Sequence, residues 1–308
     1  MAWIELHQAL PQHRKLLALR DALRLRTPAA LGHMCLLWLW ALDNAPDGDL
    51  SALPPRQLAE ICQFNARRAG ELATAIGNHD NLTSITVTSG TLDEGDWAAI
   101  KKSYAKLQII DLEGATYEGN DKDNWVYKIE GVSDNILKTV KLPQGITALG
   151  EYAFYGCAAL TTVTLPETLT SIGNYAFNAC SALTSIGLPD KVTSIGDYAF
   201  NACSALTSIT LPKTLTSIGD YAFRSCKALT SIDLPDGVTS IGENAFYNCT
   251  SLKSIDLPEG LTSIGKNAFY NCRGLTSITL PAGVTSIVTL AFYGCYNLTT
   301  VTCLATTP

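Results

Sequence analysis

The stretch LTSITLPKTLTSIGDYAFRSC, from Leu206 to Cys226, decides the fold, because close copies of it recur along the chain at a fixed interval. Leu-Pro pairs fall every 23 residues, at 142, 165, 188, 211, 234, 257 and 280. Phenylalanine keeps the same step from 154 to 292, and cysteine keeps it from 157 to 295. A unit of this length cannot bury its own apolar side chains, whereas stacked copies bury one another's. The period therefore predicts a solenoid.

The first half of each repeat has the pattern of a short strand. Leu183, Ile186 and Leu188 occupy the spacing of inward-facing positions, so the intervening Ser185 and Gly187 face outward. Repetition of this pattern predicts a row of parallel strands with an apolar inner face.

The second half of the repeat adds a further inward stripe, which begins at Val192 and Ile195. Gly196 is expected to allow a tight backbone turn. Three later positions have roughly helical spacing and predict a helical back wall: Ala199, Phe200 and Cys203. We expect each phenylalanine to pack against its equivalents in the coils above and below. The predicted fold class is an α+β solenoid.

The repeated sequence resembles the BspA-like leucine-rich repeats of bacterial surface proteins, from about residue 78 to the C-terminus. Residues 81 to 117 contain two looser copies, joined by a predicted helix from Asp93 to Tyr104, and resemble the N-terminal cap of that family. Trp97 and Trp125 are expected to seal this end. We predict a cap with irregular repeats over 78–136 and regular repeats over 137–308. The resemblance implies a non-catalytic binding scaffold, often an adhesin.

Residues 1–77 lack the repeat and are predicted to form a small all-α domain of the helix-turn-helix type. Two short helices are expected over 55–63 and 66–76, and Phe64-Asn65 would form the turn between them. Arg67 and Arg68 would then open a recognition helix, where base edges and phosphates are contacted. These two arginines are the candidate DNA contacts.

Two segments in this region, WIELHQALPQHRKLLALRDALRL and LGHMCLLWLWALDNAPDGDLSALPPRQLAEI, resemble the winged-helix domain of phage replisome-organiser proteins. That resemblance covers about residues 3 to 76 and implies a role in origin binding or helicase loading. The chain lacks the wing that the family places after the second short helix.

Charge and composition limit the kinds of partner that the protein can have. The 308 residues carry a formal charge of −6, divided as +1 up to residue 77 and −7 beyond it. Only the first segment would tolerate a polyanion. The N-terminus lacks the pattern of a secretory signal, and no apolar run is long enough to span a membrane. We expect a cytoplasmic protein as the chain stands, or a cell-surface protein if this N-terminus is not the native one.

Nothing in the sequence predicts catalysis or a cofactor. The four histidines all precede the regular repeats, and no Cys-x-x-Cys pattern suggests a metal site. The repeat contributes one cysteine per coil, from Cys157 to Cys295, and we interpret these residues as buried thiols that pack as small apolar groups. Catalytic, cofactor and metal residues are therefore all predicted to be absent.

The candidate ligand face is the strip of outward side chains on the first strand of each repeat. Its members are Thr162, Thr164, Ser185, Ser208, Thr210, Ser231, Asp233, Ser254, Asp256, Ser277, Thr279, Thr300 and Thr302. The alternative is that serine and threonine merely suit exposed strands.

Two functions from different classes follow. The first is a scaffold that binds a protein partner or an adhesin-type ligand. The second is a DNA-binding phage replication accessory with an appended repeat arm. The first is preferred because the repeats dominate the chain.

Overall fold

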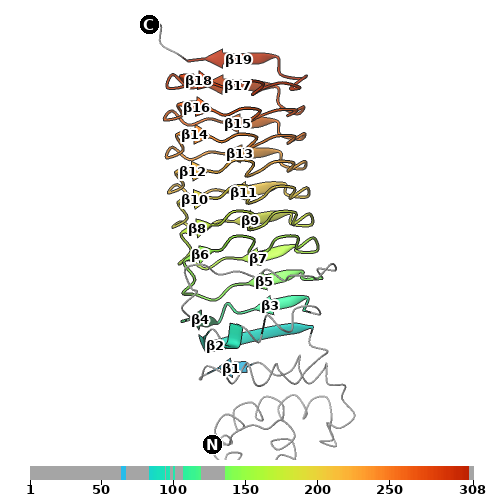
Figure 1. The fold of residues 1–308 in the computed structure, drawn as a ribbon, viewed down its shortest axis with the longest axis vertical. Coiled ribbons are helices and arrows are strands. Elements are labelled where there is room, and N and C mark those ends of the chain that lie inside the picture. The colour runs from blue at the N-terminus through green and yellow to red at the C-terminus, as the bar shows by residue number, and fades with distance from the viewer. Residues whose placement is uncertain are drawn as a thin grey trace, which may run out of the picture.

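The structure is a computed structural model and describes residues 64–66, 83–93, 95–97, 100, 107–118 and 136–304. The chain forms an elongated stack of coils, in which strand β1 lies near one end and strand β19 at the other (Figure 1). Successive coils lie directly above one another, so the predicted solenoid is confirmed.

One face of the stack carries the predicted first strand of each repeat. These strands are β3 (Ile109–Asp111), β5 (Thr139–Lys141), β7 (Thr162–Thr164), β9 (Ser185–Gly187), β11 (Ser208–Thr210), β13 (Ser231–Asp233), β15 (Ser254–Asp256), β17 (Ser277–Leu280) and β19 (Thr300–Cys303). Paired strands are parallel, and in the regular repeats partner residues are 23 positions apart, as Ser208 is from Ser185. The period of the sequence thus fixes the register of the sheet.

A second set of two-residue strands builds another face. Its members are β6 (Ala148–Leu149), β8 (Ser171–Ile172), β10 (Ser194–Ile195), β12 (Ser217–Ile218), β14 (Ser240–Ile241), β16 (Ser263–Ile264) and β18 (Ser286–Ile287). They pair in parallel with the same register, for example Ile195 with Ile218. The inward stripe predicted at Val192 and Ile195 is confirmed, and both side chains are buried.

The third wall corrects the predicted fold class, because the segment around each phenylalanine is a run of turns and not a helix. Within one coil, the amides of Asn201 and Cys203 donate to carbonyls three residues earlier, at 3.1 and 3.2 Å. The amides of Tyr198, Phe200 and Ala202 donate to the next coil instead. In the regular repeats the protein is therefore a β-solenoid.

Left-handed residues explain why this wall is not a helix. Tyr198 and Ala202 have φ angles of 56° and 59°, and the equivalent positions of the other coils repeat these values closely. A continuous helix would point all its amides along its own axis, across the stack. Placing one residue in four in the left-handed region turns alternate amides toward the neighbouring coil. Contact between coils thus overrides the helical spacing.

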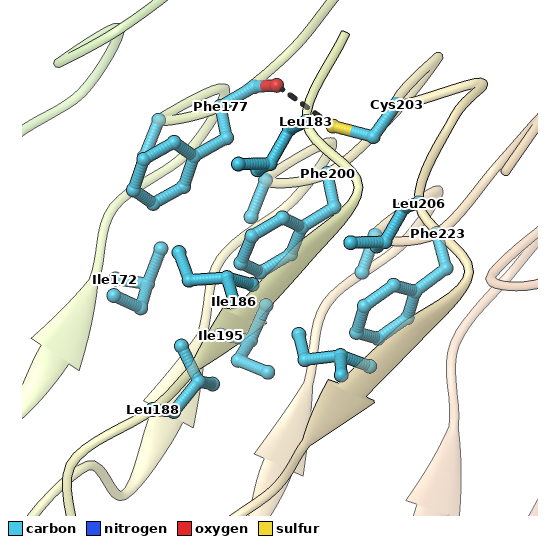
Figure 2. Close-up of a cluster of buried hydrophobic side chains, with 14 of the residues drawn as sticks. Ile172, Phe177, Leu183, Ile186, Leu188, Ile195, Phe200, Cys203, Leu206 and Phe223 are labelled. Carbon is cyan, nitrogen blue, oxygen red and sulfur yellow. Dashed lines mark hydrogen bonds between the residues drawn. The ribbon is translucent and has the colours of Figure 1, made fainter. Parts of the chain in front are cut away.

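The core consists of straight columns of identical side chains. Phe177, Phe200 and Phe223 are fully buried, with ring centroids 5.2 and 5.4 Å apart and rings nearly parallel (Figure 2). Ile186 and Leu188 lie in the same core. The predicted phenylalanine ladder is confirmed.

Gly196 serves a different purpose from the predicted turn. A Cβ atom there would lie 2.7 Å from the backbone nitrogen of Asn174 and 2.8 Å from the carbonyl carbon of Gly173. Such distances are shorter than real Cβ contacts. The glycine column therefore permits close approach of one coil to the one before it.

The cap begins with the nine-residue strand β2 (Ser84–Leu92), which pairs with β3 and with β4 (Ala115–Tyr117). After β2, the described residues 95–97 and 100 are helical, inside the range predicted for a helix. Asp93 and Asp96 cap this segment reciprocally, each backbone amide donating to the other's carboxylate. Trp97 is buried as predicted, whereas Trp125 lies outside the described residues.

The N-terminal prediction requires a correction. The expected turn at Phe64-Asn65 belongs to a strand, β1 (Phe64–Ala66), which pairs in parallel with β2. A strand therefore stands where the turn was predicted, and the structure does not support an all-α domain here. Apart from Ala66, which belongs to β1, the two predicted helices lie outside the described residues, as do Arg67 and Arg68.

Candidate binding faces of the solenoid

The predicted strip belongs to strands β7, β9, β11, β13, β15, β17 and β19, which follow one another along one face of the stack (Figure 1). Its side chains are exposed at every position except Thr164, which is half-buried. The register aligns them in two columns, so that Ser277 pairs with Thr300 and Thr279 with Thr302. The structure therefore brings the strip together as one continuous face.

Neighbouring threonines show that not every hydroxyl on this surface is available. The Thr207 hydroxyl donates to the carbonyl oxygen of Thr184 at 3.0 Å, one coil earlier. On the second face, the Thr216 hydroxyl donates to the carbonyl oxygen of Thr193 at 3.1 Å. Across the described residues, by contrast, no side chain of the strip takes part in an intramolecular hydrogen bond or ion pair. The threonine columns stabilise the stack, and the strip remains accessible.

The middle of the strip carries two carboxylates in register. Asp233 on β13 is the direct partner of Asp256 on β15, and both side chains are exposed. Like charges on adjacent strands repel each other, which is unfavourable without a compensating cation. This pair gives the otherwise neutral strip a local preference for a positively charged group.

A second feature lies on the turn wall, and sequence reasoning missed it. Seven tyrosines form what we call the tyrosine ridge: Tyr152, Tyr175, Tyr198, Tyr221, Tyr247, Tyr270 and Tyr293. The first four stack in one column, with centroid separations of 4.9, 4.7 and 4.3 Å. The last three stack in a column three residues further along each repeat, at 4.7 and 5.1 Å.

Two arginines extend the ridge through contacts with aromatic rings. The Arg224 guanidinium lies over the Tyr247 ring, 5.3 Å from its centroid, where the first tyrosine column gives way to the second. The Arg273 guanidinium lies 5.9 Å from the centroid of Tyr296, which is 75% exposed. Tyrosine and arginine are the residue types that most often dominate protein interfaces.

The pKa values of several tyrosines in the first column are raised. Burial raises the pKa of Tyr198, and the adjacent Tyr221 raises it further. Burial also raises the pKa of Tyr175, with contributions from Tyr198 and Asp197. At these two positions the neutral phenol is a hydrogen-bond donor as well as an apolar surface.

The recurring Tyr-Ala-Phe triplet could have indicated the ridge. It occurs at 152–154, 175–177, 198–200 and 221–223, and its alanine and phenylalanine belong to the buried core whereas its tyrosine does not. The shift of tyrosine by three positions after Tyr221 hides the continuity, because only the fold places both columns on one wall.

The cysteine interpretation is confirmed for the thiols from Cys157 to Cys295, all of which are buried and free. Burial raises the pKa of Cys203 to about 12, so its thiol is neutral at physiological pH. The neutral Sγ donates to the carbonyl oxygen of Phe177 at 3.1 Å (Figure 2). These residues stabilise the stack and lie away from the surface.

Other classes of site receive no support from the described ranges. Within them, no three His, Cys, Asp or Glu side chains are grouped as metal ligands would be. None of the helical segments described there is long and apolar enough to cross a membrane.

The chain was compared with known proteins. Residues 133–231 and 216–307, more than half of the chain, match the BspA type leucine rich repeat region. No curated protein matches. Among solved structures, a leucine rich repeat protein from T. pallidum is 34% identical, with a TM-score of 0.48, over 52% of this chain and 77% of that one.

A leucine rich cell surface protein from Faecalibacterium prausnitzii is 23% identical, with a TM-score of 0.42, over 73% of this chain and 84% of that one. A leucine-rich repeat protein from Bacteroides ovatus is 24% identical, with a TM-score of 0.42, over 73% and 77% of the two chains. The 23-residue repeat, the stacked coils and the matched region together establish that this chain belongs to the BspA-type leucine-rich-repeat family.

Proposed function

We propose that this protein is a non-catalytic scaffold that binds a protein partner along the side of its solenoid. The observation that supports the proposal is that some outward columns of side chains form hydrogen bonds between coils and others do not. The threonine columns of the first and second faces are used between coils, whereas the strip of the first face makes no internal bonds among the described residues. Exposed side chains of this kind bond to water in the free protein and are available to hydrogen-bond a partner.

Two lateral faces could hold that partner. The strip is flat, polar and without aromatic residues, which favours an extended polar contact centred on Asp233 and Asp256. The tyrosine ridge supplies large rings with donor hydroxyls and two arginines, which favours a tighter contact. Family membership supports the scaffold role in general, and the choice of face is the point to be tested.

One coil offers matched positions for the test. A photo-activatable phenylalanine analogue would replace Ser185 on the strip, Tyr198 on the ridge, or exposed Lys191 in the turn between the two strands. Each full-length variant would be mixed with cell extracts or with intact cells and then irradiated. The cells would come from the organism that makes the protein and from organisms that share its environment. Crosslinked proteins would be identified by mass spectrometry.

We expect one protein to be captured from one lateral face and not from position 191. Its crosslinking at Ser185 should weaken when Asp233→Lys and Asp256→Lys are added, if the strip is used. Crosslinking at Tyr198 should weaken with Tyr175→Ala and Tyr221→Ala, if the ridge is used. Equal capture at all three positions would contradict a specific lateral face.

The proposal also concerns where the protein is located. Family membership is compatible with the cell surface, which the sequence allowed as an alternative to the cytoplasm. Probing intact cells as well as extracts distinguishes the two locations.

A further inference from the structure

The turn wall carries its charges in two separate halves. The wall comprises residues 150–160 and their equivalents at each 23-residue step, up to 288–298. Up to Tyr221 its charged side chains are all acidic. Beyond that residue they are all basic except Glu243, whose Oε1 atom lies 3.6 Å from the Nζ atom of Lys266. The acidic residues of the first half are Glu151, Asp197 and Asp220, and the other basic residues of the second half are Arg224, Lys227 and Arg273. A surface with charges divided in this way is complementary to an inverted copy of itself.

The tyrosine ridge changes column at the same place, and asparagines occupy positions that the tyrosines leave. In one coil of the first half, Tyr198 lies in the first column and Asn201 in the second. In a coil of the second half the order is reversed, because Asn267 lies in the first column and Tyr270 in the second. Long aromatic side chains and short amides therefore exchange columns between the two halves of the wall.

Two of these asparagines have an acceptor that the described part of the chain does not satisfy. The Oδ1 atoms of Asn201 and Asn267 are buried and accept no hydrogen bond from any described residue. A buried acceptor without a donor costs free energy. Each side chain as a whole is only half-buried, so a small rotation of the amide brings the acceptor to the surface. Both positions can therefore accept a hydrogen bond from a donor outside the chain.

We propose that the turn wall binds the turn wall of a second copy of this chain, with the two stacks antiparallel. A two-fold axis that crosses the stack between the coils of Tyr221 and Tyr247 reverses the order of the coils and keeps each column opposite itself. The coil that contains Tyr198 then faces the coil that contains Tyr270 in the second copy. Parallel stacks would instead place the two acidic halves against each other, which like-charge repulsion disfavours.

Oppositely charged side chains meet in the antiparallel arrangement. Asp197 lies opposite Lys266 of the second copy, because the two residues occupy the same position of their coils. Both side chains are exposed in the single chain. Next to the axis Asp220 lies opposite Glu243, whose charge is already compensated by Lys266 of its own chain. Electrostatic attraction therefore favours this arrangement and this register.

Tyrosines meet asparagines in both columns of the same arrangement. Tyr198 lies opposite Asn267 of the second copy, so its hydroxyl can donate to the Oδ1 atom that lacks a donor. Tyr270 lies opposite Asn201 in the same way. Because the axis is two-fold, each contact occurs twice. The register that the charges favour therefore brings a donor to both unsatisfied acceptors.

The dimer leaves the strip of the first face uncovered, because the strip belongs to the strands and the contact is made by the turn wall. The strip would then be the face that remains open to a different protein. Dimerisation is a property of the purified chain alone, so it can be tested without that protein.

The experiment is sedimentation velocity of the purified full chain over a dilution series. We expect a dimer that dissociates on dilution. Asp197→Lys and Lys266→Asp, each alone, should be monomeric at concentrations where the wild type is dimeric, because each places like charges opposite each other. The two changes combined in one chain exchange the charges and should recover the dimer. The matched control, Asp233→Lys, makes the same change of charge on the exposed strip and should remain dimeric.

A second variant tests the hydrogen bonds without changing any charge. Tyr198→Phe combined with Tyr270→Phe keeps the rings and removes the donor hydroxyls, and should raise the dissociation constant of the dimer about ten-fold or more. Circular dichroism should show the same secondary structure in all variants.

A wild-type protein that is monomeric at every concentration would overturn the proposal. So would single charge variants that dimerise as the wild type does, or a combined charge variant that is folded and monomeric. An unchanged dissociation constant in the phenylalanine variant would exclude the tyrosine–asparagine contacts and, with them, this register.

Discussion

The thiol of Cys203 donates a hydrogen bond to the backbone carbonyl of Phe177, with 3.1 Å between the sulfur and the oxygen. The same bond recurs between Cys226 and Phe200 at 3.2 Å and between Cys249 and Phe223 at 3.1 Å. Each cysteine thus ties its coil to the coil before it. The cysteine column therefore has a structural role. A purely apolar side chain at the same position could not donate a hydrogen bond to this carbonyl oxygen.

The repeat thiols should react slowly in the native protein. Burial raises the pKa of Cys203 and of Cys249 to about 12, and the reactive thiolate is therefore rare at neutral pH. Alkylation at neutral pH followed by intact-mass analysis should label exposed Cys303 quickly and the repeat cysteines only after denaturant is added. Rapid native labelling of most repeat cysteines would contradict the assignment.

The same thiols should make stability fall at alkaline pH. The folded pKa of Cys249 is raised from 9.0 to about 12, so the stabilising effect is complete below pH 9 and is lost as pH rises toward 12. Urea unfolding measured across this range should show a falling midpoint. Cys249→Ser, whose hydroxyl does not ionise there, should show a smaller fall, and an equal fall would exclude a role for this thiol.

The phenylalanine column should carry a large part of the stability. Phe223 is fully buried between Phe200 and Phe246, so Phe223→Ala is expected to reduce the free energy of unfolding by about 3–5 kcal/mol. Phe292, in the last described coil, is only half-buried, and Phe292→Ala should cost clearly less. Thermal or urea unfolding would be measured for both variants. Equal losses of stability would mean that stacking between two neighbouring rings does not determine the contribution of each phenylalanine.

Two glycines of one repeat should respond in opposite ways to alanine. At Gly196 a Cβ would press on the backbone of the preceding coil, so Gly196→Ala should destabilise the fold by about 1–3 kcal/mol. At Gly187 a Cβ meets nothing within 4 Å, and Gly187→Ala should be neutral or stabilise the strand by about 0.5–1 kcal/mol. Urea unfolding decides between the two, and a destabilised Gly187→Ala would show that the outer face is more crowded than described.

The left-handed alanines are a further place where the fold can be improved. Ala202 has a φ of 59°, a region that alanine adopts at a cost and glycine adopts freely. Ala202→Gly should therefore raise the free energy of unfolding by about 1 kcal/mol. The control is Ala199→Gly at a buried position outside the left-handed set, which should destabilise. A loss of stability at Ala202 would show that the lost methyl contacts outweigh the relief of strain.

Much of the architecture followed from the sequence alone, because each repeat has the same pattern of apolar positions and stacks on a copy of itself. The inward positions Leu183, Ile186 and Leu188, the phenylalanine ladder and the outward strip are all consequences of period and alternation. A 23-residue step also fixes the strand register, since any slip would expose a whole apolar column.

Tertiary structure decided the rest through contacts that local spacing does not encode. Ala199, Phe200 and Cys203 have helical spacing, yet bonds from Tyr198 and Phe200 to the next coil turned the wall into left-handed turns. The strand at Phe64–Ala66 arises from pairing with β2, which no local pattern indicated. The tyrosine ridge joins two columns that are three residues apart in the repeat. In each case the contact that determines the structure is made with a residue of another coil or strand. The sequence gives the type of side chain at each position, whereas only the stacked fold determines which residues lie next to it.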